Sequence, residues 1–206
     1  MVVTNIEELA KSRSKIYIDG EFAFVLYKGE LRLYGMKVGA QLSQNDYQTI
    51  MNEVLPKRAK LRSMNLLKSK DYTKEQLRRK LREGFYPEAI IDEAIEYVKS
   101  YHYIDDYRYC IQFIEYNAVA KSRQRMIRDL GTKGVDREVI LKAMDELSEN
   151  TSLYSEDALI KDLIKKKNFD IQTTDNKEKQ RIMRYLYGKG FSMESINKAI
   201  GMSYSD

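Results

Sequence analysis

The chain is poor in the residues that most often build compact chemical sites. It has one histidine, one cysteine, two prolines and no tryptophan among 206 residues. Cys110 alone cannot form an internal disulfide, which fits a reducing compartment, and its apolar neighbours in YCIQF predict a small core residue rather than a nucleophile. His102 lies near Asp105 and Asp106. We interpret it as an exposed residue at a helix junction, with Asp105 as an N-cap, rather than as a metal ligand.

Long apolar runs and nucleotide-binding motifs are also missing. No run approaches the ~20 apolar residues of a membrane helix, and the first residues lack the apolar core of a signal peptide. The phosphate loop GxxxxGK[ST] does not occur, and Met193 stands where Gly188 and Gly190 would need a third glycine. Carboxylates have no nucleophile or metal framework beside them. We therefore predict a cytoplasmic, monomeric protein that is not an enzyme, contacts no membrane and needs no cofactor and no metal.

Tyrosine, in contrast, is abundant, with 16 copies. Six crowd one stretch of the chain: Tyr97, Tyr101, Tyr103, Tyr107, Tyr109 and Tyr116. Several recur at helical spacing with Ile104 and Phe113, so we interpret them as core and junction packing. Stacking on nucleic-acid bases is the alternative reading of such a cluster.

The first 54 residues differ from the rest by their two-residue alternation of apolar side chains. SKIYID and EFAFVLY flank Asp19 and Gly20, and Asp-Gly between two such runs is a strong hairpin signal because a type I′ turn needs two residues that tolerate positive φ. A short helix then follows, with Ser43 as its N-cap. We expect residues 1–54 to form a β-hairpin plus a short helix.

The remaining chain repeats itself three times. The similar stretches are EGFYPEAIIDEAI (83–95), KGVDREVILKAM (133–144) and KGFSMESINKAI (189–200), which align on Gly84, Gly134 and Gly190. Each glycine suits the left-handed residue after a helix. Asp136 and Ser192 can N-cap the next helix, and Pro87 fits its first turn. The following acid, Glu88, Glu138 or Glu194, suits the positive end of the helix dipole, and Ile90, Ile140 and Ile196 begin a buried stripe.

Two amphipathic segments precede each glycine, so the repeating unit has three helices. Capping boxes at Thr73 and Asp175 mark two helix starts. The predicted fold is therefore mostly α: tandem three-helix repeats in an elongated right- or left-handed array, with a small N-terminal β-hairpin region. The repeat boundaries are set at 55–104, 105–150 and 151–206.

Charge follows the repeat. The first two helices of each unit are basic and the third is acidic, so stacking predicts one basic flank along the array. We expect eight arginines to form a partner-binding or DNA-binding basic face: Arg78, Arg79, Arg82, Arg123, Arg125, Arg128, Arg181 and Arg184. Ordinary solvated decoration of helix surfaces is the competing interpretation.

The combined pattern resembles the bacterial RecX regulatory proteins. The stretch TKEQLRRKLREGFYPEAIIDEAIEYVKSYHYIDDYRYC holds the elements of their signature, and the resemblance covers about residues 55–200. Those elements are Leu77, Lys80 and Leu81, then Gly84 and Phe85, then Ile90 and Ile91, then Tyr103, Ile104, Asp105 and Asp106; Lys133-Gly134 and Lys189-Gly190-Phe191 match in the later units. One departure is that the first unit is one residue short between Leu81 and Gly84.

This resemblance implies a modulator of the recombinase RecA. It implies binding along the groove of the RecA–DNA filament, with inhibition of ATP hydrolysis, strand exchange and coprotease activity, and for some relatives direct contact with single- or double-stranded DNA. Two alternatives stay open. One is a generic helical-repeat scaffold that binds another protein, and the other is a DNA-binding protein that acts without RecA.

Overall fold

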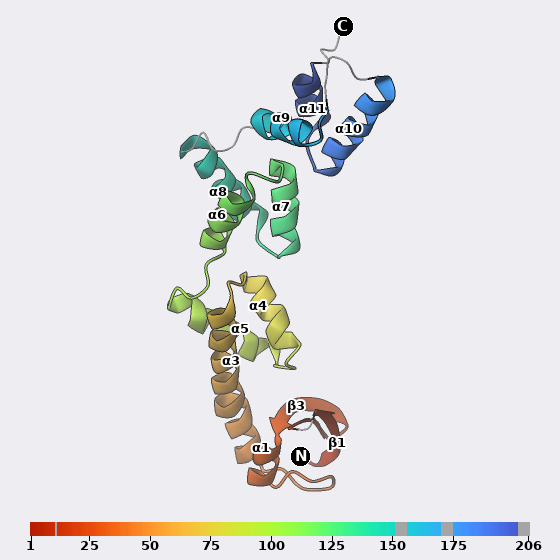
Figure 1. Ribbon diagram of the computed structural model, residues 1–206. Coiled ribbons are helices and arrows are strands. Elements are labelled where there is room, and N and C mark those ends of the chain that lie inside the picture. The colour runs from red at the N-terminus through yellow and green to blue at the C-terminus, as the bar shows by residue number, and fades with distance from the viewer. Residues whose placement is uncertain (11, 151–155, 170–174, 202–206) are drawn as a thin grey trace. The chain divides into compact units, whose positions relative to one another are not determined.

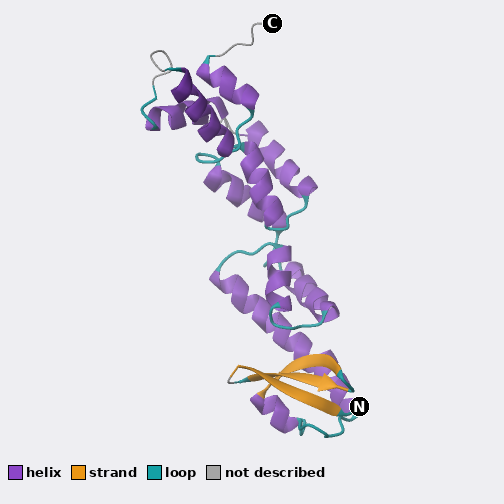
Figure 2. Cartoon of the chain, turned by 90° about the vertical axis from the view of Figure 1, so that its right-hand side faces the viewer, coloured by secondary structure: helices purple, strands orange, loops and turns teal. Residues whose placement is uncertain are grey.

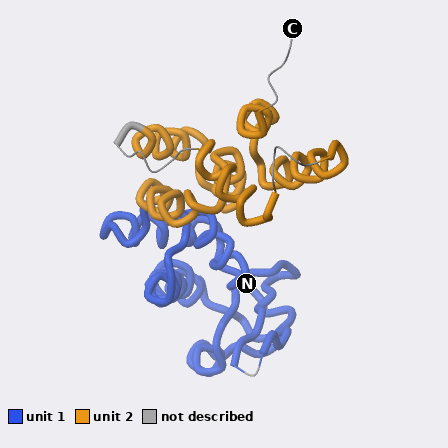
Figure 3. The backbone as a smooth tube through the Cα atoms, turned by 45° about the horizontal axis from the view of Figure 1, so that its top comes forward, with its two compact units in different colours: residues 1–105 blue, residues 106–206 orange. Residues whose placement is uncertain are grey.

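The protein divides into two compact units, each described here by itself (Figure 3). The computed structural model describes residues 1–10, 12–150, 156–169 and 175–201. The units are Met1–Asp105 and Asp106–Asp206. The boundary predicted between residues 150 and 151 borders a stretch outside the described residues. A mostly helical fold with a small N-terminal sheet is confirmed (Figure 2).

The N-terminal region of the first unit is a three-stranded antiparallel sheet in the order β1-β2-β3. Its strands are β1 (Val3–Ala10), β2 (Arg13–Ile18) and β3 (Glu21–Tyr27). The predicted hairpin is β2-β3, and its turn residues Asp19 and Gly20 have φ of 49° and 92°, as a type I′ turn requires. Strand β1 was not predicted, because its side chains after Val3 are mostly exposed and show no clean apolar alternation.

The sheet and the first repeat share one hydrophobic core. After α1 (Lys28–Leu33), the chain forms α2 (Gln44–Thr49), a π-helical turn η1 (Ile50–Val54) and α3 (Leu55–Ser69). Ser43 caps α2 as predicted, accepting a 3.0 Å hydrogen bond from the Asp46 backbone N–H. Helix runs directly from η1 into α3, so the predicted boundary at residues 54 and 55 falls inside continuous helix (Figure 1). Phe24 and Leu26 from β3 belong to the same buried cluster as Leu77 and Ile91 from the repeat.

Each repeat consists of three helices, as expected. The first is completed by α4 (Lys74–Arg82) and α5 (Glu88–Ser100). The second comprises α6 (Asp106–Asn117), α7 (Arg123–Thr132) and α8 (Arg137–Asn150), and the third α9 (Glu156–Lys166), α10 (Asn176–Gly188) and α11 (Met193–Ile200). In the second unit each trio has its own buried cluster, and Cys110 lies fully buried in one of them, as predicted. No helix of the described residues is long and apolar enough to span a bilayer.

The turn between the second and third helix of each repeat corrects the alignment made on glycines. The left-handed residue is Phe85 in the first repeat, with φ of 62°, and Gly134 and Gly190 in the others, with φ of 82° and 90°. Gly84 does not adopt this conformation, so its predicted role was wrong. The deletion between Leu81 and Gly84 shifts the glycine by one position, and the phenylalanine takes the place that glycine usually fills.

Backbone hydrogen bonds establish the corrected register. The N–H groups of Tyr86, Val135 and Phe191 donate to the carbonyls of Leu81, Leu130 and Leu186, respectively. These bonds are the six-to-one bonds of a Schellman turn, so the three leucines are equivalent. In this register Pro87 is the N-cap of α5 rather than part of its first turn. The counterpart of Ile140 and Ile196 is then Ile91, not Ile90 as the glycine alignment had it.

Buried polar contacts join the second and third repeats within the second unit. Ser122 caps α7, and its hydroxyl also donates to the Lys189 carbonyl at 3.2 Å. The Glu156 carboxylate accepts from the Arg123 backbone N–H at 3.1 Å and from the Ser195 hydroxyl at 3.2 Å. The N-terminus of α7 therefore contacts the end of α10 and the start of α9, and Glu156 links α9 to α11.

A tyrosine titration tests the packing of α6 against α8. The Tyr107 hydroxyl donates to the Glu146 carboxylate, and this bond raises the pKa of Tyr107 to about 12. Because the folded pKa lies above that of a free phenol, the bond contributes stability that is present below pH ~10 and is lost as pH rises through about 12. We expect ultraviolet absorbance to show late-titrating tyrosines, and the Glu146→Gln variant should return the contribution of Tyr107 towards the ordinary range while leaving the others unchanged. An unchanged titration curve in that variant would contradict the contact.

Candidate functional site

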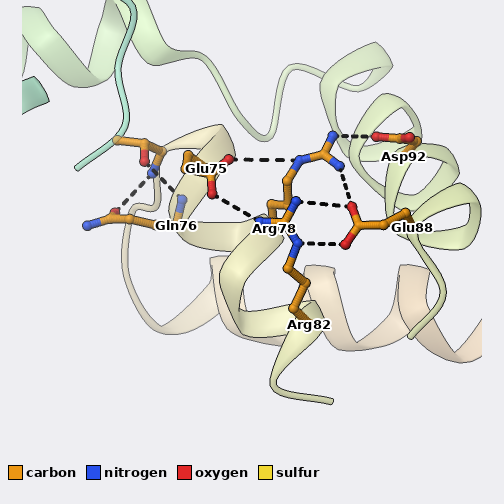
Figure 4. A network of polar contacts seen from close by, with 7 residues as sticks. Glu75, Gln76, Arg78, Arg82, Glu88 and Asp92 are labelled. Atoms are coloured by element: carbon orange, nitrogen blue, oxygen red, sulfur yellow. Dashed lines mark hydrogen bonds and ion pairs between the residues drawn. The ribbon is translucent and has the colours of Figure 1, made fainter. Parts of the chain in front are cut away.

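Two of the three arginines predicted on α4 form ion pairs within their own repeat. Arg78 lies 3.1 Å from Glu88 and 3.9 Å from Glu75 and also contacts Asp92, while its side chain is only 16% exposed. Arg82 lies 2.6 Å from Glu88 and 3.3 Å from Glu75. Figure 4 shows both guanidinium groups facing these carboxylates on α4 and α5. The basic and acidic helices of the first repeat therefore neutralise each other here.

The pKa shifts of this network agree with its geometry. Hydrogen bonds from Arg82 and then Arg78 lower the pKa of Glu88. The hydrogen bond to Asp92 raises the pKa of Arg78. The charged forms thus stabilise one another at neutral pH, and these two arginines are less available to an external anion than the sequence pattern implied.

The corrected register identifies a different arginine as the one that recurs. Counted back from the equivalent leucines, Arg79, Arg128 and Arg184 occupy the same position of the second helix, and all three are exposed. Arg78 instead corresponds to Ile127 and Met183, which lie half-buried. Position in the repeat therefore explains why Arg78 packs towards α5 while its neighbour projects outward.

Of the other predicted arginines, some form ion pairs with aspartates and others do not. Arg123 contacts Asp145 at 2.7 Å, and Arg125 contacts Asp129 at 3.0 Å. Arg128 and Arg181 are exposed and have no ion pair within the described ranges. The eight predicted residues thus do not behave as one set.

The structure does bring Arg125 and Arg184 together, in a cleft between the second and third repeats of the second unit. The cleft has a volume of about 600 Å³ and is lined by Ala120, Lys121, Arg125, Arg184, Tyr185, Gly188 and Lys189. Lys121 and Arg125 share the Asp129 carboxylate at 2.9 and 3.0 Å. The Arg184 Nε–H donates to the neutral carbonyl of Gln180 at 3.4 Å. Four cationic side chains therefore line the cleft, and the Asp129 carboxylate offsets part of their charge. The remaining positive charge suits an anion.

An apolar pocket adjoins the cationic cleft and shares Arg184 with it. Its volume is about 450 Å³, and it is lined by Gln180, Met183, Arg184, Tyr187 and Met193. Tyr187 is 64% exposed and Met193 40% exposed. A cationic cleft beside an exposed apolar pocket can bind a partner that presents an apolar side chain next to a carboxylate or a phosphate.

Sequence reasoning missed most of the residues that complete this site. Lys121 and Lys189 lie in turns, and only the fold places them beside Arg125 and Arg184. Tyr185 carries Lys189 over its ring at 5.6 Å. The sequence signal for Lys189 was the repeated Lys-Gly turn, which served above only to align the repeats.

The tyrosine-rich stretch is partly core and partly exposed. Tyr97 packs against the first core, but Tyr101, Tyr103 and Tyr116 are 57%, 50% and 84% exposed. Tyr101 stacks on Tyr103 with ring centroids 5.9 Å apart, in the turn after α5 where His102 has φ of 56°. These two rings pack on each other at the helix junction, whereas the exposure of Tyr116 departs from the predicted packing. No cluster of three or more histidine, cysteine or acidic side chains that could hold a metal occurs in the part of the chain that the structure describes.

Comparison with known proteins points to one family. The family model described as the third three-helix domain of RecX matches residues 155–200, and that of the first three-helix domain matches residues 59–97. A "Regulatory protein RecX" from Caldanaerobacter subterraneus subsp. tengcongensis is 30% identical over 205 residues, covering 98% of this chain and 100% of the relative. One from Clostridium acetobutylicum is 28% identical, covering 99% and 97%.

Solved structures show the same fold. A structure titled "Crystal structure of regulatory protein RecX" superposes with a TM-score of 0.63 at 23% identity, covering 98% of this chain and 99% of the other. RecX from Lactobacillus salivarius superposes with a TM-score of 0.59 at 22% identity, covering 72% and 96%. The three-helix architecture is therefore shared across this set of proteins.

Proposed function

Since this chain belongs to the RecX family of regulatory proteins, we propose that it regulates RecA by binding the RecA–DNA filament and inhibiting RecA's ATPase, strand-exchange and coprotease activities. The proposed regulator acts in the cytoplasm and by binding, without a chemical step of its own. Its partner is the filament, and the DNA phosphates within the filament are the proposed anions for the cationic cleft.

The observation that carries this proposal is the cleft at Lys121, Arg125, Arg184 and Lys189. Phosphate groups favour arginine because the guanidinium fork donates two parallel hydrogen bonds to two oxygens. Arg128 on α7, which is exposed and occupies the position equivalent to Arg184, offers a further contact of the same kind. Several weak contacts on one chain add through multivalency, which suits binding to a polymer of identical subunits.

The test is the DNA-dependent ATPase of a preformed RecA filament titrated with this protein. We expect the wild-type chain to lower the ATPase, and Arg125→Glu/Arg184→Glu to need about tenfold more protein for half inhibition. Each lost phosphate contact should also flatten the salt dependence of binding by about one unit of slope. Circular dichroism of the variant checks that its helices remain.

A charge-matched control separates the cleft from general electrostatics. The pair Arg137→Glu/Lys161→Glu changes net charge equally at exposed positions on α8 and α9, outside the cleft. We expect this control to inhibit within about twofold of wild type. Equal loss in both variants would assign the effect to overall charge, and no loss in either would remove the cleft from the mechanism.

Direct DNA binding without RecA is the second candidate, because the same four cations would attract free DNA. A gel shift on single- and double-stranded DNA in the absence of RecA distinguishes the two. Binding to free DNA as tight as to the filament, with no effect on the ATPase, would favour the second candidate. A scaffold for an unrelated protein would show neither effect.

A further inference from the structure

A second cationic pocket lies in the first unit, and none of the eight arginines discussed above lines it. It has a volume of about 270 Å³ and is lined by Tyr27, Arg58, Leu61, Arg62, Asn65, Leu66 and Tyr86. Helix α3 contributes five of these side chains, and Tyr27 and Tyr86 complete the lining. Tyr86 is half-buried, and this burial raises the pKa of its phenol.

The two arginines of this pocket have different roles. Arg58 is fixed in place: it donates to Glu30 at 2.8 Å and to the Val25 carbonyl at 2.6 Å, and it lies 4.9 Å from the ring centre of Tyr27 and 5.8 Å from that of Tyr86. It joins α3 to the end of β3 and the start of α1. Its charge is therefore already used to hold the fold together.

Arg62, one turn further along α3, has no such compensation. It is half-buried, and its Nε atom, like that of Arg58, is buried without a hydrogen-bond partner. Unlike Arg58, it forms no ion pair with any described residue. A partly desolvated guanidinium costs free energy unless an anion approaches its remaining N–H groups. Residues that cost stability in this way and line a pocket are candidates for ligand binding.

The surroundings of Arg62 add to its positive potential. Helix α3 carries five basic and no acidic side chains. Lys57, Leu61, Asn65 and Lys68 recur at steps of three or four residues and are all exposed, so they form one outward face that spans about 16 Å. Leu61, 57% exposed, adds an apolar patch at the rim of the pocket.

We propose that this pocket binds a carboxylate side chain from an acidic protein segment, with Arg62 as its anchor. An aspartate or glutamate would enter the pocket and pair with the Arg62 guanidinium fork, while an apolar neighbour in the segment covers Leu61. Lys57 and Lys68 would attract further acids on either side. Asn65 offers both a donor and an acceptor to the backbone of an extended peptide.

A carboxylate fits this pocket better than a nucleic-acid phosphate. A phosphodiester carries a sugar on each side, and both would have to pass the apolar rim formed by Leu61 and Leu66. The faces of Tyr27 and Tyr86 nearest the pocket are occupied by Arg58, so they are not free platforms for stacked bases. A side-chain carboxylate reaches inward on its own methylene groups, which the leucines and rings can cover.

The side-chain Nε–H signal of Arg62 in a ¹H–¹⁵N correlation spectrum tests the proposal on the full chain. The probe is the end-blocked peptide Glu-Glu-Leu-Glu-Glu at fixed ionic strength, compared with Gln-Gln-Leu-Gln-Gln, inorganic phosphate and a short oligothymidylate. We expect saturable movement of the Arg62 signal with the acidic peptide and none with the glutamine peptide. Arg62→Leu should weaken acidic-peptide binding at least fivefold, and Arg62→Lys, which keeps the charge but not the fork, should weaken it less.

Arg137→Leu, an equal charge change on α8, is the matched control and should bind the peptide as wild type does. If Arg62→Leu fails to fold, the wild-type titration and the lysine variant still decide the question. Movement of the signal by oligothymidylate at lower concentration than by the peptide would overturn the proposal in favour of a nucleic-acid site. Unchanged peptide binding in Arg62→Leu would overturn it as well. None of these arms contains RecA, so the outcome is independent of the function proposed above.

Discussion

Replacing Gly190 by alanine is expected to lower the free energy of unfolding of the second unit by about 2–4 kcal/mol. Gly190 has φ of +90°, and a Cβ atom there would lie 2.7 Å from the Ser122 hydroxyl oxygen and 3.1 Å from the Arg125 Cβ. The left-handed backbone accounts for about 1 kcal/mol of the cost and the overlap for the rest. Ser122 cannot simply move away, because it caps α7 and also binds the Lys189 carbonyl.

Urea unfolding and amide hydrogen exchange measure this effect, with faster exchange expected in α7 and α10. Gly201→Ala is the matched control, since Gly201 also has positive φ, of 74°, but a Cβ atom there would contact no described residue within 4 Å. It should cost only about 1 kcal/mol, from backbone strain. Equal losses at the two positions would show that the joint between the repeats contributes nothing beyond that strain.

Reversing the charge of Arg78 is expected to damage the first repeat rather than a binding surface. Arg78→Glu would place a fourth carboxylate among Glu75, Glu88 and Asp92, on a side chain that is 16% exposed. We expect the free energy of unfolding to fall by about 2 kcal/mol. This value is small for so many contacts because the three partner carboxylates are screened by water. Thermal unfolding followed by circular dichroism measures it, and any loss of RecA inhibition should follow the loss of folded protein.

A charge swap distinguishes pairing from side-chain size. Arg78→Glu/Asp92→Arg restores one ion pair across α4 and α5 and should recover part of the lost stability. A double variant no more stable than Arg78→Glu would mean that the pair contributes little. Full stability of the single reversal, together with lost inhibition, would return Arg78 to the binding face.

The paired arginines show where the repeat pattern was sufficient and where it was not. The pattern predicted the three-helix units and a bias of positive charge towards the second helix. It could not distinguish Arg78 from Arg79, because adjacent residues point about 100° apart on a helix and only the packing partner decides which of them meets α5. The same limit applies to Phe85, whose left-handed conformation follows from a one-residue deletion that alignment on glycines concealed.

The sequence by itself determined the mostly helical class, the three trios, the N-terminal hairpin turn and the main caps, because these depend on local propensity and on periods of two and 3.6 residues. The cationic cleft depends on tertiary structure, since it joins residues more than sixty positions apart across two repeats. The pocket at Arg62 depends on it too, because Tyr27 reaches α3 only after the sheet has packed against the repeat. The positions of charged and aromatic residues follow from the sequence. Whether a charge is neutralised depends on which residues the tertiary structure places next to it.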